Sequence, residues 1–277
     1  MMLYQRLSSS LVLVCILILI FNSIFFFKLI LIHVLSIISM WEYFRILNLK
    51  KYSILSDSEE LNNILLTRTK NNFFEYFIII CSQIVLLLHL NIFENIYYFA
   101  LMLVFFFLCL TFRDLLFFLG SVYLFTPFFF LNYLDNQQAY YFLSLIFIIT
   151  IASDSGGYIF GRILKGPKLI KSVSPNKTWS GFFGGILLSI ASITFLTSSH
   201  NILLSLCLTI FFSIGCQSGD IIESFVKREI KIKNSGSLIP GHGGILDRLD
   251  SFYLLSIILM FLYIYNVKLI KLFDLNF

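Results

Sequence analysis

Nine apolar runs, each about as long as one crossing of a lipid bilayer, follow one another along this 277-residue chain. A membrane-crossing helix needs about 20 predominantly apolar residues. Hydrophobic residues make up 58% of the chain and charged residues 13%, whereas about a quarter of the residues of a soluble globular protein are charged. We therefore expect an all-α, polytopic integral membrane protein with about nine transmembrane helices. The nine runs cover roughly residues 8–27, 29–46, 73–91, 95–111, 114–132, 139–160, 181–198, 201–217 and 251–267.

Lysine and arginine are distributed unevenly between the loops that join these runs. With the N-terminus in the cytoplasm, seventeen of the twenty basic residues fall on the inner side, and only Lys28, Lys268 and Lys271 fall outside. Cytoplasmic loops of membrane proteins carry an excess of these residues. The pattern predicts a cytoplasmic N-terminus and cytoplasmic loops at 161–180 and 218–250. The net charge of +5 reflects this bias and gives no indication of nucleic-acid binding, for which the sequence has no motif.

Neither the N-terminus nor the cysteines indicate a secreted, disulfide-bonded protein. No small-residue cleavage site follows the apolar run after Arg6, which favours a signal anchor. All five cysteines lie in apolar runs without CxxC spacing, as expected of small buried hydrophobes rather than a disulfide or zinc framework. They are Cys15, Cys81, Cys109, Cys207 and Cys216.

The chain changes character near residue 150. Thirteen of the fourteen glycines and three of the four prolines lie beyond it. We expect residues 1–138 to form N-terminal transmembrane helices that pack or face lipid, and residues 139–277 to form a catalytic region. In the first half, we interpret Trp41-Glu42-Tyr43 as part of an interfacial aromatic belt rather than as a functional group.

Gln217 to Ser251 is a polar, glycine-bearing segment between two strongly apolar runs. If the preceding helix continues through its start, Asp220, Glu223, Ser224 and Lys227 share one helical face. That face would aim two carboxylates and a cation at one place. The alternative is a cytoplasmic loop whose charges simply face water. Against it, these carboxylates lie next to apolar segments and are interleaved with cations at helical spacing.

The turn Pro240-Gly241-His242-Gly243-Gly244 leads to Asp247-Arg248-Leu249-Asp250 at the start of the last apolar run. Glycines let the backbone approach a ligand closely and adopt positive φ, and a helix start offers free N–H groups to an anion. Asp220 and Asp247, one at each end of the polar segment, could therefore converge on a divalent metal ion. Basic side chains and backbone amides nearby would bind phosphates.

Asp154 lies inside the sixth apolar run, in Ser153-Asp154-Ser155-Gly156-Gly157-Tyr158. A carboxylate in a membrane helix costs about 2.5 to 3.5 kcal/mol on insertion scales, so a function or a partner is expected. The structural alternative is an ion pair with Arg162, two turns further on.

A second polar motif runs from Ser172 to Gly181 and contains Ser174-Pro175-Asn176-Lys177-Thr178. Ser-Pro sets a turn, after which Lys177 and Thr178 can present an ammonium and a hydroxyl to a phosphate at the start of a helix. An ordinary helix N-cap at Ser174-Pro175 is the alternative.

The polar segment resembles the signature of the phosphatidate cytidylyltransferases, also called CDP-diacylglycerol synthases. Ser174-Pro175, Lys177-Thr178-Trp179 and Gly181 are similar to a second element of that family, in the right order. The resemblance covers about residues 150 to 252, with two departures: Asn234 stands where the family usually has Asp, and Ser180 where it has Glu. The matching positions of the first signature are Ser224, Phe225, Val226, Lys227, Arg228, Lys233, Gly236, Ile239, Pro240, His242, Gly243, Gly244, Asp247, Arg248 and Asp250.

The resemblance implies a reaction of CTP with phosphatidic acid that gives CDP-diacylglycerol and pyrophosphate. From the residues themselves we expect Mg²⁺ bound by Asp220 and Asp247, with Asp250 as a weaker candidate, and a second, monovalent cation as an option. The expected catalytic residues are Asp220, Asp247, His242 and Lys227. The expected substrate-binding residues are Asp154, Ser174, Lys177, Thr178, Arg228, Gly243, Gly244 and Arg248.

The expected setting is the inner (plasma) membrane, with the active site on the cytoplasmic side. Membrane lipids are the expected surroundings, nucleic acid is not an expected partner, and a homodimer is implied by the resemblance only. Three alternatives are a membrane transporter, a degenerate enzyme kept for assembly, and a CTP-dependent enzyme acting on another lipid phosphate or a lipid alcohol. The clustering of polar groups in loops on one side, rather than at the midplane of paired repeats, disfavours a transporter.

Overall fold

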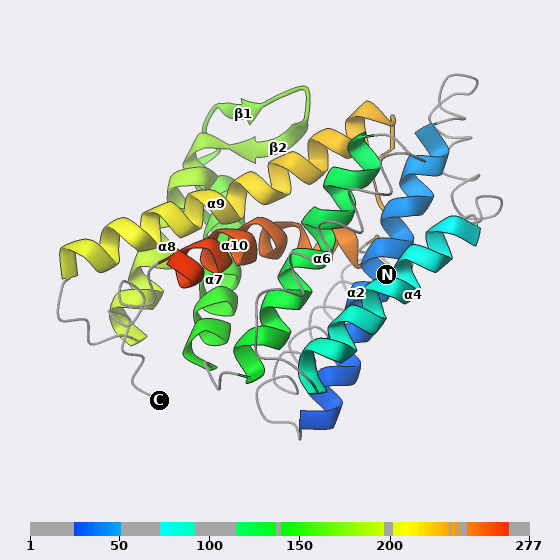
Figure 1. Ribbon diagram of the computed structural model, residues 1–277. Coiled ribbons are helices and arrows are strands. Elements are labelled where there is room, and N and C mark those ends of the chain that lie inside the picture. Colours follow the sequence, from blue (N-terminus) through cyan, green and yellow to red (C-terminus); the bar gives the residue numbers. More distant parts are fainter. Residues whose placement is uncertain are drawn as a thin grey trace. The chain divides into compact units, whose positions relative to one another are not determined.

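The computed structural model describes residues 25–50, 73–91, 115–136, 140–196, 202–232, 234–236, 238 and 243–265. These residues form seven helices and one short hairpin (Figure 1). The helices are α2 (Phe25–Lys50), α4 (Phe73–Asn91), α6 (Leu115–Asn136), α7 (Tyr140–Leu164), α8 (Trp179–Leu196), α9 (Ile202–Glu229) and α10 (Leu246–Tyr265). The strands are β1 (Lys168–Ile170) and β2 (Ser174–Thr178).

The described part of the chain is an all-α, polytopic membrane protein, as predicted. Five of its helices, α2, α6, α7, α8 and α9, are long and apolar enough to cross a membrane, and α4 contains a shorter apolar stretch, Phe73–Leu86. The predicted run 95–111 and all but the last three residues of 8–27 lie outside the described residues. The predicted number of nine crossings therefore stays a prediction.

The chain divides into two compact units. The first comprises Met1–Asn136 and Val226–Leu249, and the second comprises Gln137–Phe225 and Asp250–Phe277. Helices α9 and α10 each contribute residues to both units. The predicted assignment of catalysis to residues 139–277 stays a prediction.

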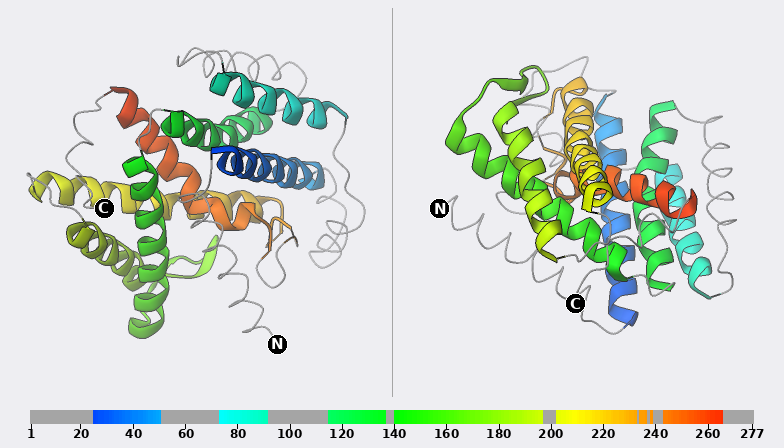
Figure 2. Two further views of the ribbon diagram at one scale, coloured as in Figure 1. Left: turned by 90° about the horizontal axis from the view of Figure 1, so that it is seen from below. Right: turned by 90° about the vertical axis from the view of Figure 1, so that its left-hand side faces the viewer.

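In the first unit, α2, α4 and α6 pack against one another pairwise (Figure 2, blue, cyan and green). Phe44 and Phe117 stack with their ring centroids 4.7 Å apart. Polar groups add contacts between helices: the Tyr43 hydroxyl donates to the Leu116 carbonyl at 2.6 Å, and Asn132 Nδ2 donates to the Leu86 carbonyl at 3.0 Å. Hydrogen bonds of this kind join helices in lipid, where the hydrophobic effect offers no drive for helix association.

In the second unit, α7 packs along α8, and small residues line their contact. A Cβ at Gly156 would approach the Gly184 carbonyl to 2.5 Å, so only glycine fits this position. Ser213 of α9 donates to Ser153 of α7, and Ser189 of α8 donates to Ser213, each at 3.3 Å. Three of the unit's helices are thereby linked by one chain of hydroxyl groups.

The connection between α7 and α8 is an antiparallel hairpin in which Lys168 pairs with Thr178 and Ile170 with Ser174. A turn at residues 171–173 joins its strands. The turn therefore precedes Ser174-Pro175 rather than being set by it, and β2 delivers Lys177 and Thr178 directly to the start of α8.

Candidate functional site

Helix α9 is continuous from Ile202 to Glu229, which confirms the helical spacing of the acidic and basic residues at the start of the polar segment. The Ser224 hydroxyl donates to Asp220 Oδ1 at 3.3 Å, one turn apart on this helix. Glu223 and Lys227 are both buried, each with 7% of its surface exposed. Two charged side chains on this helix are thus withdrawn from solvent rather than displayed on a solvated face.

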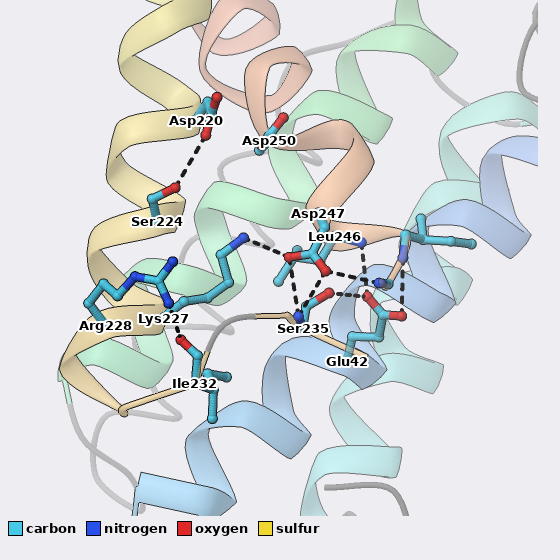
Figure 3. A network of polar contacts seen from close by, with 12 residues as sticks. Glu42, Asp220, Ser224, Lys227, Arg228, Ile232, Ser235, Leu246, Asp247 and Asp250 are labelled. Atoms are coloured by element: carbon cyan, nitrogen blue, oxygen red, sulfur yellow. Dashed lines mark hydrogen bonds and ion pairs between the residues drawn. The ribbon is translucent and has the colours of Figure 1, made fainter. Parts of the chain in front are cut away.

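Asp247 is the centre of a polar network in the first unit (Figure 3). Lys227 Nζ lies 2.6 Å from Asp247 Oδ1. The Ser235 amide donates to Asp247 Oδ2 at 2.9 Å and to Oδ1 at 3.1 Å, and the Gly244 amide donates to Oδ2 at 2.9 Å. Each carboxylate oxygen therefore has at least two donors. Charge-assisted bonds of this type are about twice as strong as neutral ones.

The two glycines before Asp247 make room for carboxylates. Gly243 has φ +88°, and a Cβ on it would collide with Asp247 Oδ2. A Cβ on Gly244 would collide with the Ser235 hydroxyl and with the carboxylate of Glu42. The close backbone approach expected of these glycines is thus made to the protein's own acidic side chains.

Glu42 is a member of this network that the sequence interpretation missed. It lies on α2, is fully buried, and accepts hydrogen bonds from the Ile245 amide at 3.1 Å, the Leu246 amide at 2.9 Å and the Ser235 hydroxyl at 3.0 Å. The sequence contained a signal for it, because a carboxylate in a membrane-spanning run needs a partner or a function. We applied that rule to Asp154 and not to Glu42.

The other basic residues of the polar segment have different surroundings. Arg228 Nη1 donates to the Ile232 carbonyl at 2.9 Å, and Lys231 adopts φ +59° in the turn that follows α9. Arg228 therefore connects the last turn of α9 to the segment that follows the helix. Arg248 is exposed, as is Asn234.

In the second unit, Lys177 and Asp220 form a second short ion pair. Lys177 Nζ lies 2.6 Å from Asp220 Oδ2 and also donates to the Gln217 carbonyl at 3.3 Å. The two side chains are 25% and 29% exposed. Both ion pairs thus join a predicted phosphate-binding or catalytic lysine to a predicted metal-binding aspartate.

Thr178 caps helix α8. Its Oγ1 accepts a hydrogen bond from the Gly181 amide at 3.1 Å and lies 3.0 Å from the Ser180 hydroxyl. The alternative of a cap at Ser174-Pro175 is wrong, because these residues lie in β2 and the cap is four residues later. Ser180, which replaces the glutamate of the family pattern, accepts a hydrogen bond from the Gly166 amide at 3.1 Å and so ties the hairpin to α8.

Asp154 of α7 accepts a hydrogen bond from the Ser251 hydroxyl of α10 at 3.1 Å, and the Ser251 amide donates to Asp250 Oδ1 at 2.7 Å. The structure thus brings Asp154 and Asp250 to one serine. Arg162, the alternative partner of Asp154, donates from Nη1 to the Tyr158 hydroxyl at 2.9 Å.

The predicted site residues therefore fall in two groups. Lys227, Arg228, Gly243, Gly244, Asp247 and Arg248 belong to the first unit, and Asp154, Ser174, Lys177, Thr178, Asp220 and Asp250 to the second. His242 lies outside the described residues. Within the described part of the chain, no three His, Cys, Asp or Glu side chains are grouped so that they could hold a metal ion.

Mg²⁺ nevertheless suits the oxygen donors present. It is usually held by one or two carboxylates together with water and substrate phosphates, not by a cage of protein ligands. Asp220 is part-exposed and offers hard carboxylate oxygens of the kind that Mg²⁺ prefers. The assignment of Asp220, Asp247 and Asp250 as ligands stays a prediction.

Comparison with known proteins agrees with these motifs. The model of the cytidylyltransferase family matches residues 4–266. Phosphatidate cytidylyltransferases of Staphylococcus haemolyticus, Staphylococcus epidermidis and Staphylococcus aureus are 43%, 45% and 39% identical over 124 residues, which are 43% of this chain and 48% of each relative. The chain thus spans about half the length of the curated relatives that it matches. Because the family model covers nearly all of its residues, the chain belongs to the cytidylyltransferase family.

Proposed function

We propose that this protein transfers a cytidylyl group from CTP to phosphatidic acid, giving CDP-diacylglycerol and pyrophosphate for phospholipid biosynthesis. The observation that carries the proposal is the network around Asp247, in which Lys227, Ser235 and Gly244 of the polar segment converge on one carboxylate. The names of the Staphylococcus relatives support the same reaction. Family membership favours it over the transporter alternative.

The reaction requires two polyanions to approach each other. An oxygen of the lipid phosphate attacks the α-phosphorus of CTP, and the bond to the departing pyrophosphate breaks. Two like charges 4 Å apart repel by about 4 kcal/mol at an effective dielectric constant of 20. Positioned cations offset this repulsion, and positioning with electrostatic stabilisation provides most of the catalysis in phosphoryl transfer.

Lysines held by aspartates suit this task. Lys227 and Lys177 are each paired with a carboxylate at 2.6 Å, and this pairing orients their ammonium groups. If a substrate phosphate replaces the aspartate as the partner of such an ammonium, an aspartate oxygen becomes available to bind another cation. Arg248 is exposed and adds a further phosphate donor, and Arg228 can act as one if it leaves the Ile232 carbonyl.

Asp220 and Asp247 are the proposed Mg²⁺ ligands, Asp250 is a weaker third, and a monovalent cation is an optional second ion. Bound Mg²⁺ would neutralise charge on the triphosphate and the leaving pyrophosphate. The attacking phosphate monoester is already largely ionised near neutral pH, so no strong base is required of the protein. His242 is proposed to bind phosphate or to move a proton.

The membrane supplies one substrate and the cytoplasm the other. Five helices are long and apolar enough to cross a bilayer, which supports sideways entry of phosphatidic acid from the lipid. The excess of basic residues in loops supports a cytoplasmic site in the inner (plasma) membrane, where CTP is available. A homodimer is a further proposal, made from the family resemblance.

The test is an acceptor comparison with purified protein in lipid or detergent, Mg²⁺ and CTP that carries ³²P at the α-phosphate in one series and at the γ-phosphate in another. We expect labelled liponucleotide with phosphatidic acid as acceptor and none with diacylglycerol. Labelling of diacylglycerol alone would instead indicate a CTP-dependent lipid kinase. Substrate flux across sealed vesicles without CTP consumption would indicate a transporter.

A further inference from the structure

Glu42 is a buried carboxylate whose role the reaction scheme leaves open. It belongs to α2, yet all three of its donors lie about 200 positions later in the chain: Ser235 is 193 residues away and Leu246 is 204. Its side chain is fully buried, so no hydrogen bond to bulk water replaces these contacts. A buried charge is tolerated only where it is paired and hydrogen-bonded.

The contacts fix the start of α10. Ile245 and Leu246 are the last residue before this helix and its first residue, and their amides are among the donors that no carbonyl within the helix can satisfy. A side-chain carboxylate at this place both accepts these hydrogen bonds and complements the positive end of the helix dipole. Glu42 therefore caps α10 from another helix.

Asp247 is the next residue of the same helical turn. It accepts hydrogen bonds from the Ser235 amide and the Gly244 amide, while Glu42 accepts them from the Ser235 hydroxyl and the Ile245 amide. Glu42 and Asp247 thus both contact Ser235, and they accept hydrogen bonds from the neighbouring amides of Ile245 and Gly244, respectively. Gly244 fits between them, because a Cβ there would collide with Glu42.

We propose that Glu42 is a positioning residue of the reaction centre, which holds Asp247 in place by fixing the first turn of α10 and Ser235. Glu42 touches neither substrate nor reacting atoms in this scheme. Its effect on turnover rests on the proposed function, whereas its effect on the backbone around Asp247 does not.

The primary test is amide hydrogen exchange in the full-length protein, comparing wild type with Glu42→Gln. The amide keeps the size of the side chain but replaces one acceptor oxygen by a donor group. We expect exchange at Ser235, Gly244, Ile245 and Leu246 to accelerate at least about tenfold, since hydrogen bonds to a charged group are stronger than those to a neutral amide. The last turns of α10 should exchange as in wild type.

Glu75→Gln is the matched control. Glu75 is a buried carboxylate of the same unit, on α4, and accepts a hydrogen bond from Asn48 Nδ2 at 2.9 Å. It should leave exchange at Ser235 and Gly244 unchanged. Equal acceleration in both variants, or none in Glu42→Gln, would overturn the proposal.

Ser235→Ala is the second variant, for the event that Glu42→Gln does not fold. It removes only the hydroxyl donor to Glu42 and leaves the Ser235 amide that Asp247 accepts. Exchange at Ile245 and Leu246 should rise by a factor of a few, and an unchanged rate would contradict a shared network. In turnover assays Glu42→Gln should lower kcat about tenfold or more with little change in the KM for CTP, because Glu42 contacts no substrate.

The two proposals fail in different ways. An inactive wild type with accelerated exchange in Glu42→Gln would refute the cytidylyl transfer and keep the positioning role. An active wild type whose Glu42→Gln variant retains both exchange rates and kcat would refute the positioning role and keep the reaction.

Discussion

Several hydrogen-bond donors contact the carboxylate of Asp247. Its carboxylate meets an ammonium and two backbone amides, and its side chain is only 10% exposed. These contacts give Asp247 a structural role, since a buried charge that loses its partner is strongly destabilising, and its role in the reaction is the proposal. Substitutions must therefore separate loss of folding from loss of chemistry.

Asp247→Asn should lower turnover at least about a hundredfold, as the removal of a key electrostatic group at a reaction centre does. The variant keeps one oxygen for the Lys227 ammonium but loses the negative charge. The measurement is the rate of CDP-diacylglycerol formation by equal amounts of membrane-inserted protein. Wild-type activity in this variant would remove Asp247 from the proposed metal site.

The double variant Lys227→Met with Asp247→Asn tests the pair itself. Replacing both partners of a buried ion pair is often neutral or stabilising, whereas removing one charge costs about 3 to 5 kcal/mol. We expect Lys227→Met alone to lower the thermal midpoint and the double variant to recover most of that loss while remaining inactive. A double variant less stable than Lys227→Met would contradict the pairing.

Lys177→Ala should mainly raise the half-saturating concentration of CTP or phosphatidic acid. Its side chain is part-exposed and therefore accessible to a phosphate, although its ammonium is paired with Asp220. Lys171→Ala, an exposed lysine in the turn of the same hairpin, is the control. If kcat and both half-saturating concentrations match the wild type, Lys177 does not contact phosphate.

The sequence identified individual site residues, but it did not predict which residues they contact. Lys227 and Asp247 were identified because they lie in a charged segment next to apolar runs, and Lys177 because it follows Ser174-Pro175 at a helix start. Which lysine meets which aspartate depends on packing between distant segments, and helical spacing does not determine it. The sequence marks Glu42 as a carboxylate in a membrane-spanning run, but it does not indicate the partners of Glu42, because the donors are about 200 residues away.

At the scale of elements, long apolar helices were predictable and the short hairpin was not. The predicted run 73–91 coincides with α4, and 181–198 lies within two residues of α8. Strands β1 and β2 contain only three and five residues. These are too few for the alternation of apolar and polar residues that is typical of a strand to be recognised. The extension of α9 to Glu229 follows from helical spacing, which the sequence analysis had stated as a condition.

Thr178→Ala should destabilise the start of α8 by about 1 kcal/mol, the usual effect of removing an N-cap hydroxyl. Thr178→Ser keeps the hydroxyl that accepts from the Gly181 amide and should lose far less. Thermal unfolding of the purified protein measures the difference. Equal stability of the two variants would show that the cap contributes nothing.

At the scale of the whole molecule, the charge distribution predicts which side of the membrane carries the site. In a variant without the native cysteines, cysteines placed at Lys171 and Asn234, both exposed, should react with a membrane-impermeant maleimide only in inside-out vesicles. A cysteine at Lys28, predicted to lie outside, should react only in right-side-out vesicles. Labelling of Lys171→Cys and Asn234→Cys from opposite sides would refute the shared cytoplasmic location.

The most direct test of cytidylyl transfer follows the α- and γ-phosphates of CTP into the products. Purified protein receives phosphatidic acid, Mg²⁺ and CTP labelled with ³²P at either the α- or the γ-phosphate. Cytidylyl transfer predicts that α-label enters the lipid fraction and γ-label appears as pyrophosphate. Entry of γ-label into lipid, or no CTP-dependent labelling of lipid by an intact protein, would contradict it.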